Sequence, residues 1–220
     1  MPDAVSDLRL SAETATRMLL SAAGEILAHQ DLLTKLDSAI GDGDHGTTMG
    51  RAAREAIDKL RETRPASAAE AFLLVADVFL NLDGGAAGPL FGTFLEGMAR
   101  ELPESAGAAG FARAAAAGLS ALRGLTKAAP GDKTLVDALT AASEALWAAS
   151  GGDLGAALEA AGEAAWRGAE STKDMVARAG RARHRGEASA GHQDAGATSA
   201  ALLFRGFAAA FTGTERTIDG

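Results

Sequence analysis

Apolar residues recur at intervals of three and four along most of this sequence, which is the spacing of one buried face of an α-helix. The first such series after Ser11 consists of Ala15, Met18, Leu19, Ala22 and Ile26. A second consists of Met49, Ala52, Ala53, Ala56 and Leu60. No stretch shows a convincing strand pattern, and abundant alanine with only 5% aromatic residues also favours helices over sheets. The sequence therefore predicts an all-α fold.

Polar and glycine-rich stretches divide this helical pattern into segments. The helical spacing continues up to the first glycine-rich loop through Leu32, Leu33 and Leu36. After that loop and the second apolar series, Ser67 to Glu70 has the form of a capping box, in which both side chains satisfy free amides at a helix start. The apolar face of the helix that follows consists of Phe72, Val75 and Phe79.

The second half of the sequence contains four alanine-rich segments of helical character, at about 107–123, 134–149, 154–178 and 196–212. With the first half they make about eight helices, with no linker long enough to divide the chain and no repeat of fixed period. We therefore expect a single helical domain over 1–220, with its core at about 10–212. The expected architecture is an up-and-down antiparallel bundle or barrel.

Composition excludes several classes of function. The chain has no cysteine, so disulfides, zinc–thiolate sites and thiol catalysis are excluded, and a bound metal must be held by oxygen or imidazole. The formal net charge of -8 argues against binding to nucleic acid or to an anionic membrane. No apolar run approaches the roughly 18 residues of a membrane span, and the first residues lack the apolar block of an export signal. A cytoplasmic protein is expected.

The stretch GDGDHG, Gly41 to Gly46, matches the G-x-G-x-x-G pattern of dinucleotide-binding loops. Such a loop follows a strand, whereas the residues before this one have helical spacing. A Walker A sequence does not occur in the chain. An EF-hand is excluded because the twelfth residue counted from Asp42 is Ala53 rather than glutamate. The motif therefore needs another explanation.

Three aspartates, Asp37, Asp42 and Asp44, offer that explanation. Asp37 lies near the end of a predicted helix, and the glycines around the other two allow the backbone to bring all three together. Carboxylates so close repel one another unless a cation joins them, and Mg²⁺ held by carboxylates keeps positions open for phosphate. The alternative is that these aspartates are ordinary solvated loop or capping residues.

The residues that follow this loop favour the metal interpretation. His45, Gly46, Thr47 and Thr48 begin the next helix, so free backbone amides and hydroxyl groups lie beside the carboxylates. Both kinds of group suit a phosphate.

Three later stretches also have the form of a glycine-bearing helix start, at 84–89, 131–134 and 191–198. In an up-and-down bundle, helix starts after alternate connections lie at the same end. The four loops are therefore expected to form one site, in which Lys133 could neutralise phosphate charge.

Four segments of the sequence resemble the L subunit, or C-terminal nucleotide-binding domain, of dihydroxyacetone kinases. In order they are LDSAIGDGDHGTTM, GGAAGPLFGTF, GDKTLVDAL and GRARHRGEASAGHQDAGATSAAL, and the resemblance extends over roughly 10–212. It implies an eight-helix barrel of antiparallel helices with ADP or ATP at one end. It also implies two Mg²⁺ ions between the nucleotide phosphates and the aspartates.

The resemblance assigns roles to individual residues and assigns none as catalytic. The implied metal ligands are Asp37, Asp42 and Asp44. The implied phosphate contacts are His45, Gly46, Thr47 and Thr48, with Ala86 and Ala87 in the loop on the phosphate side. The residues implied to be at or near the adenosine, or in the loops that hold it, are Gly131, Leu135, Arg181, Asp194, Ala195 and Gly196.

The chain departs from the family pattern at three positions. Ala87 stands where the family usually has serine, so one hydroxyl contact to phosphate is missing. Leu135 replaces a methionine and preserves an apolar contact to adenine. Ala195 replaces the proline of a D-P-G sequence, which loosens that loop. None of these changes removes an implied metal ligand.

The resemblance implies that the chain transfers a phosphoryl group to dihydroxyacetone, or a related short ketose, held covalently on a histidine of a separate K subunit. We expect the phosphotransferase-system form, in which ADP stays bound as a coenzyme and a phosphohistidine protein rephosphorylates it. The reason is that relatives that use ATP are often fused to the K domain. Two alternatives stay open: an ATP-dependent kinase subunit for another three- or four-carbon ketose, and a nucleotide-loaded regulatory protein that binds a partner such as a transcription regulator.

Overall fold

The computed structural model describes residues 9–83 and 85–213, so Gly84 of the second glycine-rich loop lies outside the described residues. Within them the chain forms α1 (Ala12–Ala28), α2 (Gln30–Ile40), α3 (His45–Thr63), α4 (Ala68–Leu80), α5 (Ala87–Glu101), α6 (Ala108–Leu125), α7 (Leu135–Ala148), α8 (Leu154–Ser171) and α9 (Ala195–Thr212), with 3-10 helices η1 (Thr172–Asp174) and η2 (Arg181–Ser189). The β structure in these ranges is one isolated antiparallel bridge between Leu10 and Ala106. The predicted all-α fold is confirmed.

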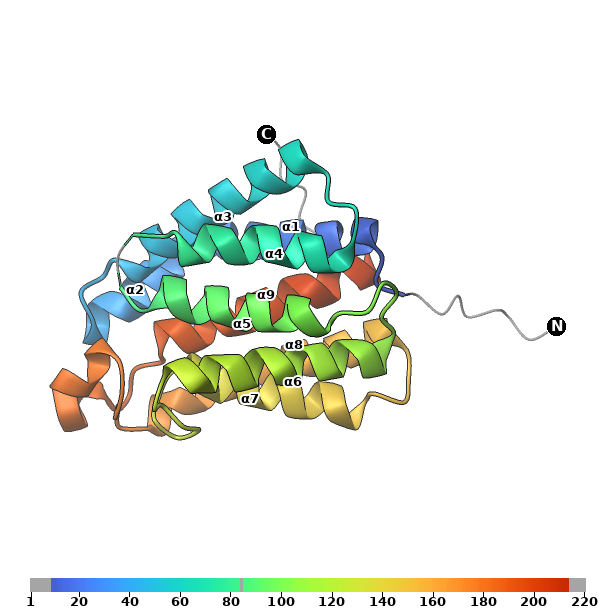
Figure 1. Ribbon diagram of the computed structural model, residues 1–220. Coiled ribbons are helices and arrows are strands. Elements are labelled where there is room, and N and C mark those ends of the chain that lie inside the picture. Colours follow the sequence, from blue (N-terminus) through green and yellow to red (C-terminus); the bar gives the residue numbers. More distant parts are fainter. Residues whose placement is uncertain (1–8, 84, 214–220) are drawn as a thin grey trace.

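From α3 onward, consecutive α-helices run antiparallel and lie side by side (Figure 1). The most extensive packing joins α4 to α5, α5 to α6, α7 to α8 and α8 to α9, and α1 packs against α9. The starts of α3, α5, α7 and α9 therefore lie at one end of the bundle, on the left of Figure 1, together with α2 and η2. Among the described helices, none has the combination of length and apolar character that crossing a bilayer requires.

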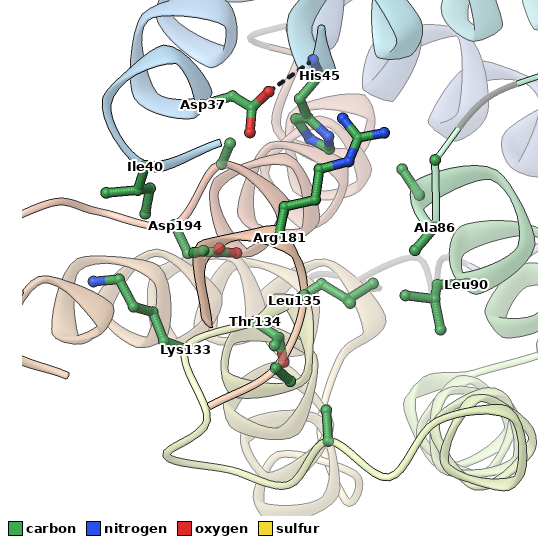
Figure 2. Close-up of a pocket in the computed structure, with 18 of the residues that line it drawn as sticks. Asp37, Ile40, His45, Ala86, Leu90, Lys133, Thr134, Leu135, Arg181 and Asp194 are labelled. Carbon is green, nitrogen blue, oxygen red and sulfur yellow. Dashed lines mark hydrogen bonds between the residues drawn. The ribbon is translucent and has the colours of Figure 1, made fainter. Parts of the chain in front are cut away.

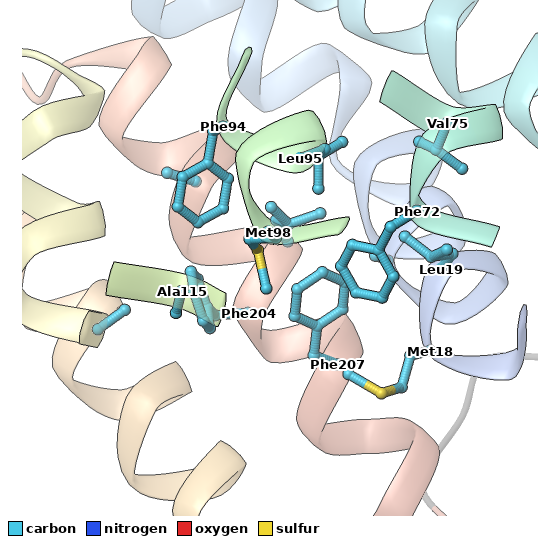
Figure 3. Close-up of a cluster of buried hydrophobic side chains, with 14 of the residues drawn as sticks. Met18, Leu19, Phe72, Val75, Phe94, Leu95, Met98, Ala115, Phe204 and Phe207 are labelled. Carbon is cyan, nitrogen blue, oxygen red and sulfur yellow. The ribbon is translucent and has the colours of Figure 1, made fainter. Parts of the chain in front are cut away.

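Helix α9 runs through the middle of the apolar core, and nearly all of its residues are buried. Its Phe207 ring lies 5.8 Å from the ring of Phe72 on α4 and 6.1 Å from that of Phe111 on α6. Phe204, one turn earlier, packs against Phe94 on α5 (Figure 3). Many other buried positions are alanines, which allow the helices to approach closely.

Two helix boundaries differ from the sequence prediction. The helical spacing before the first glycine loop belongs to two helices, because the chain turns at His29, whose ring Nδ1 lies 2.8 Å from the carbonyl oxygen of Glu25. The segment predicted to be helical to residue 178 ends at Ser171 and continues as η1. There the Lys133 amino group donates hydrogen bonds to the carbonyl oxygens of Thr172 and Met175, which an unbroken helix would use internally.

We expect Ser67→Ala to lower the free energy of unfolding by about 1 kcal/mol, because it removes the cap of α4. The Ser67 hydroxyl accepts a hydrogen bond from the amide of Glu70 at 3.0 Å. The Glu70 carboxylate accepts one from the amide of Ala66, one residue before the position that a capping box uses. Urea unfolding measures the effect, and Ser67→Asp, which keeps an acceptor, is the matched control. Equal losses in the two variants would contradict a capping role.

Candidate functional site

A pocket of about 210 Å³ opens at the end of the bundle where the four glycine-bearing loops meet. All four loops contribute to its lining, as the up-and-down arrangement predicts. The site residues named from the sequence that line it are Asp37, Asp44, His45, Thr48, Ala86, Ala87, Lys133, Leu135, Arg181, Asp194, Ala195 and Gly196. Figure 2 shows several of them converging from different helices.

The three aspartates lie together at one side of this pocket. Each of Asp37, Asp42 and Asp44 offers a carboxylate oxygen, and these oxygens lie within 4.8 Å of one another. Asp37 is in the last turn of α2, and the other two belong to the turn between α2 and α3. Gly43 has a φ of 80°, which favours glycine at this position. At Gly41, a β-carbon would lie 2.1 Å from an oxygen of Asp37, so glycine leaves room for that carboxylate.

The start of α3 is tied to the same carboxylates. The backbone amide of His45 donates a hydrogen bond to Asp37 Oδ2 at 3.2 Å, so a carboxylate satisfies one of the free amides of this helix end. Negative charge at this position is also favoured by the helix dipole.

Arg181 contacts two of the three aspartates. Its guanidinium Nη1 forms ion pairs with Asp42 Oδ2 and, at 3.0 Å, with Asp44 Oδ1. Desolvation raises the pKa of the Asp42 carboxyl, but the hydrogen bond and charge of Arg181 outweigh it, so the net pKa lies below the ordinary value. The hydrogen bonds to Asp44 and Asp42 raise the pKa of Arg181. The resemblance puts Arg181 near the adenosine, whereas in this structure its charged end lies at the carboxylates.

The ring of His45 is held by a residue that the sequence analysis missed. Its Nε2 lies 2.8 Å from the hydroxyl oxygen of Ser199, which is fully buried on α9. Burial lowers the pKa of His45, although Asp37 and Asp44 act in the opposite direction. Burial therefore favours the uncharged form of the ring. The one sequence signal for Ser199 is its helical position, one turn after Ala195.

The pocket also has an apolar part of its lining, which was largely missed from the sequence. It includes Ile40 from α2, Leu90 and Phe91 from the first turns of α5, and Leu135 at the start of α7. Leu90 and Phe91 directly follow the glycine-rich loop that contains Ala86 and Ala87. Their position next to this motif is the sequence feature that could have identified them as pocket residues. An apolar wall facing a few polar groups suits a flat organic ring system with a charged end.

Lys133 does not have the geometry expected of a phosphate contact. Its side chain is 1% exposed, and its amino group donates hydrogen bonds to the carbonyl oxygens of Thr172, Met175 and His192. Burial lowers its pKa, against the opposing effect of nearby carboxylates. The expectation that Lys133 neutralises phosphate is therefore corrected: this lysine joins the loop before α7 to the segments on either side of η2.

Four residues named from the sequence are not among those that line the pocket. Asp42 reaches the site through its ion pair with Arg181. Thr47 is exposed, and the amide of Gly131 donates a hydrogen bond to Asp137. Gly46 packs against α2, where a β-carbon would lie 2.2 Å from the hydroxyl oxygen of Thr34.

Asp194, at the start of α9, has the most strongly raised pKa of the pocket. Its carboxylate is partly buried at the pocket wall, and desolvation raises its pKa to about 6, although a hydrogen bond from the amide of Ala197 opposes the shift. The folded state therefore holds this proton between pH 4 and 6, where the unfolded chain has lost it. The associated stability is present below pH 4 and is lost as the pH rises through about 6.

We expect Asp194→Asn to gain stability relative to the unsubstituted chain as the pH rises from 4 to 7. The gain can reach about 3 kcal/mol, because asparagine caps the helix without the cost of a desolvated charge. Urea unfolding of both proteins across this pH range measures the difference. A difference that does not change with pH would contradict the assignment of the raised pKa to Asp194.

Comparison with known proteins places this geometry in a family. The chain matches the protein-family model described as the DAK2 domain over residues 39–209. Human triokinase/FMN cyclase is 37% identical over 207 residues, which cover 93% of this chain and 36% of that protein. The ADP-binding subunit DhaL of the PEP-dependent dihydroxyacetone kinase of Escherichia coli is 38% identical over 195 residues, which cover 84% of this chain and 91% of the subunit.

A solved structure supports the same relationship. The crystal structure of the dihydroxyacetone kinase from C. freundii in complex with AMP-PNP and Mg²⁺ resembles the chain with a TM-score of 0.72 at 26% sequence identity. The match covers 94% of this chain and 36% of that one. The chain thus spans about a third of the length of the triokinase and of the crystallised kinase. With a family match over most of its residues and the same fold, the chain belongs to the DAK2 domain family.

Proposed function

We propose that this chain is the nucleotide-binding component of a dihydroxyacetone-type kinase. It holds ADP or ATP with Mg²⁺ in the pocket and passes the phosphoryl group to dihydroxyacetone, or a related short ketose, on a separate K subunit. The observation that carries the proposal is the convergence of three carboxylates, a helix start and an apolar wall in one pocket. A continuous buried cluster from Leu10 to Ala210 supports treating 10–212 as one domain.

The donor atoms of the carboxylate cluster fit the proposed metal. Asp37, Asp42 and Asp44 supply oxygen ligands, which Mg²⁺ prefers, and we propose that they hold two ions. When bound, Mg²⁺ neutralises charge on the phosphates that would otherwise repel these carboxylates.

The remaining pocket residues position the nucleotide. The loop at the start of α5 and the side chain of Thr48 line the pocket, and the free amides of that helix start suit an anion. Leu90 and Leu135 exclude water from the side proposed for adenine. The hydrogen bond between the His45 ring and Ser199 keeps the start of α3 in place. Phosphoryl transfer depends on such positioning more than on covalent chemistry by the protein.

Two phosphoryl donors are compatible with this proposal. The first form to test has ADP as a bound coenzyme that a phosphohistidine protein of the phosphotransferase system rephosphorylates. The second has ATP as an exchanging substrate. The E. coli ADP-binding subunit, human triokinase and the L-erythrulose 1-kinase of Mycolicibacterium smegmatis are 38%, 37% and 38% identical to this chain, so identity favours neither form.

One experiment separates the two forms. The purified chain is dialysed at length in Mg²⁺ buffer and denatured, and released nucleotide is identified by chromatography. About one ADP per chain supports the coenzyme form, and an empty protein that binds ATP reversibly supports the ATP-dependent form. A chain that binds neither nucleotide in the presence of Mg²⁺ contradicts the proposed function.

A regulatory role without catalysis is the second candidate. Ala86 and Ala87 line the pocket with methyl groups, so this loop offers no hydroxyl to a phosphate. Such a protein would bind nucleotide and a partner such as a transcription regulator, but would not phosphorylate a ketose on any K subunit. Detection of that transfer rejects this candidate.

A further inference from the structure

Arg181 and a divalent cation would depend on the same carboxylate oxygens. In the described part of the chain, the ion pairs of Asp42 and Asp44 are both with Arg181 Nη1. These two aspartates, with Asp37, are the residues whose oxygens converge closely enough to hold a metal. A guanidinium and a divalent cation repel each other, so the binding of one to these carboxylates weakens the binding of the other.

The local structure allows the Arg181 side chain to leave without disturbing the fold. The side chain is 46% exposed, so no core packing holds it. Gly180, immediately before it, has a φ of 64° and no atom within 4 Å of the place of a β-carbon. The next residue, Ala182, is buried with Ile40 and Ala177, which anchors the backbone beside the pocket. A change of rotamer alone can therefore move the guanidinium from the carboxylates toward the pocket, which Arg181 also lines.

We propose that Arg181 is the internal counter-ion of the carboxylate cluster and competes with the metal for it, leaving the cluster when metal and nucleotide bind together. The inference rests on the proposed function. Metal that binds alone must displace the ion pair, whereas phosphate groups in the pocket offer the displaced guanidinium a new anionic partner. Metal and nucleotide therefore strengthen each other's binding, and by linkage the factor is the same in both directions.

The proposal predicts opposite effects of one substitution on two ligands. Without nucleotide, Arg181→Gln binds Mn²⁺ about two- to fivefold more tightly than the unsubstituted chain. This factor corresponds to the free energy of an exposed ion pair, which the metal no longer has to break. The same variant binds ADP with Mg²⁺ at least about fivefold more weakly, because the phosphates lose their cationic partner. Arg181→Lys, which keeps the charge but lacks the planar fork, gives intermediate values for both.

Titration calorimetry with Mn²⁺ alone, and with ADP in Mg²⁺ buffer, measures both effects. Arg183→Gln is the matched control, because it removes the same charge from an exposed position two residues further along η2. This control should leave both affinities unchanged. Unchanged or weaker Mn²⁺ binding by Arg181→Gln overturns the inference and leaves the proposed function standing. Failure of the unsubstituted chain and of Arg181→Gln to bind Mn²⁺ or ADP at all overturns the proposed function, and the inference with it.

Discussion

Asp44→Asn is expected to lower the rate of phosphoryl transfer to a ketose by at least about 1,000-fold, because loss of metal stabilisation costs several kcal/mol of the barrier. Asp44 lies in the pocket beside the start of α3, and its oxygens converge with those of Asp37 and Asp42. Asparagine keeps the shape of the side chain and removes its charge. The measurement is Mg²⁺-dependent transfer to dihydroxyacetone on a K subunit.

The control for Asp44→Asn is Asp58→Asn, which removes one negative charge from the exposed face of α3, the helix that begins directly after Asp44. It should transfer phosphate at the unsubstituted rate. Asp44 makes no side-chain capping hydrogen bond to α3 and is half-exposed, so loss of folding does not account for a loss of transfer. Full transfer by both Asp42→Ala and Asp44→Ala would show that the carboxylates are not a metal site.

Gly206→Ala is expected to lower the free energy of unfolding by about 3 kcal/mol or more, at the upper end of the usual effects of overpacking. Gly206 on α9 packs directly against the backbone of α1. A β-carbon there would lie 2.3 Å from Cα and 2.5 Å from the amide nitrogen of Ala22. Backbone atoms in a packed helix cannot turn aside as a side chain can, so the two helices must separate.

Urea unfolding, followed by circular dichroism, measures this loss. The matched control is Gly124→Ala on α6, where a β-carbon would meet no atom within 4 Å. Because alanine is the better helix former, this variant should gain up to about 1 kcal/mol. A loss below about 1 kcal/mol for Gly206→Ala would mean that α1 and α9 are not tightly packed there.

Local patterns predicted most of the fold and the polar part of the site. Helical spacing is set by which residues face the core, so the segments predicted from about 107, 134 and 196 begin within a residue of α6, α7 and α9. The alternation of long helices and short loops was enough to bring the four glycine-bearing loops to one end. Asp37, Asp42 and Asp44 were identifiable because they lie within eight residues of one another, at the end of a helix and in the turn that follows it. Their proximity does not depend on contacts with distant parts of the chain.

The features that the sequence could not reveal depend on contacts between distant segments. The hydroxyl of Ser199 meets the His45 ring across 154 residues, and nothing near either residue indicates the pairing. Lys133 carries the positive charge expected of a phosphate contact. The position of its amino group is instead set by hydrogen bonds to the carbonyl groups of Thr172 in η1 and of His192. Helix α8 ends at Ser171, seven residues before the periodicity alone predicted, and the Thr172 and Met175 carbonyls beyond it accept hydrogen bonds from Lys133.

The pocket is formed partly by the start of α9 and partly by loops, and we expect the sequences of these two parts to change at different rates during evolution. This helix contributes the inner wall through Asp194, Ala195 and Gly196, and then continues through the aromatic centre of the bundle. Most residues in its first turns are buried, so replacing them also changes how the helix packs against its neighbours. The loops at 85–86, 126–134 and 176–193 are more exposed, although Lys133 and Ala182 within them are buried. We expect substitutions that adapt the pocket to another nucleotide or another donor protein to occur in these loops. The residues at the start of α9 are expected to change as slowly as those of the core.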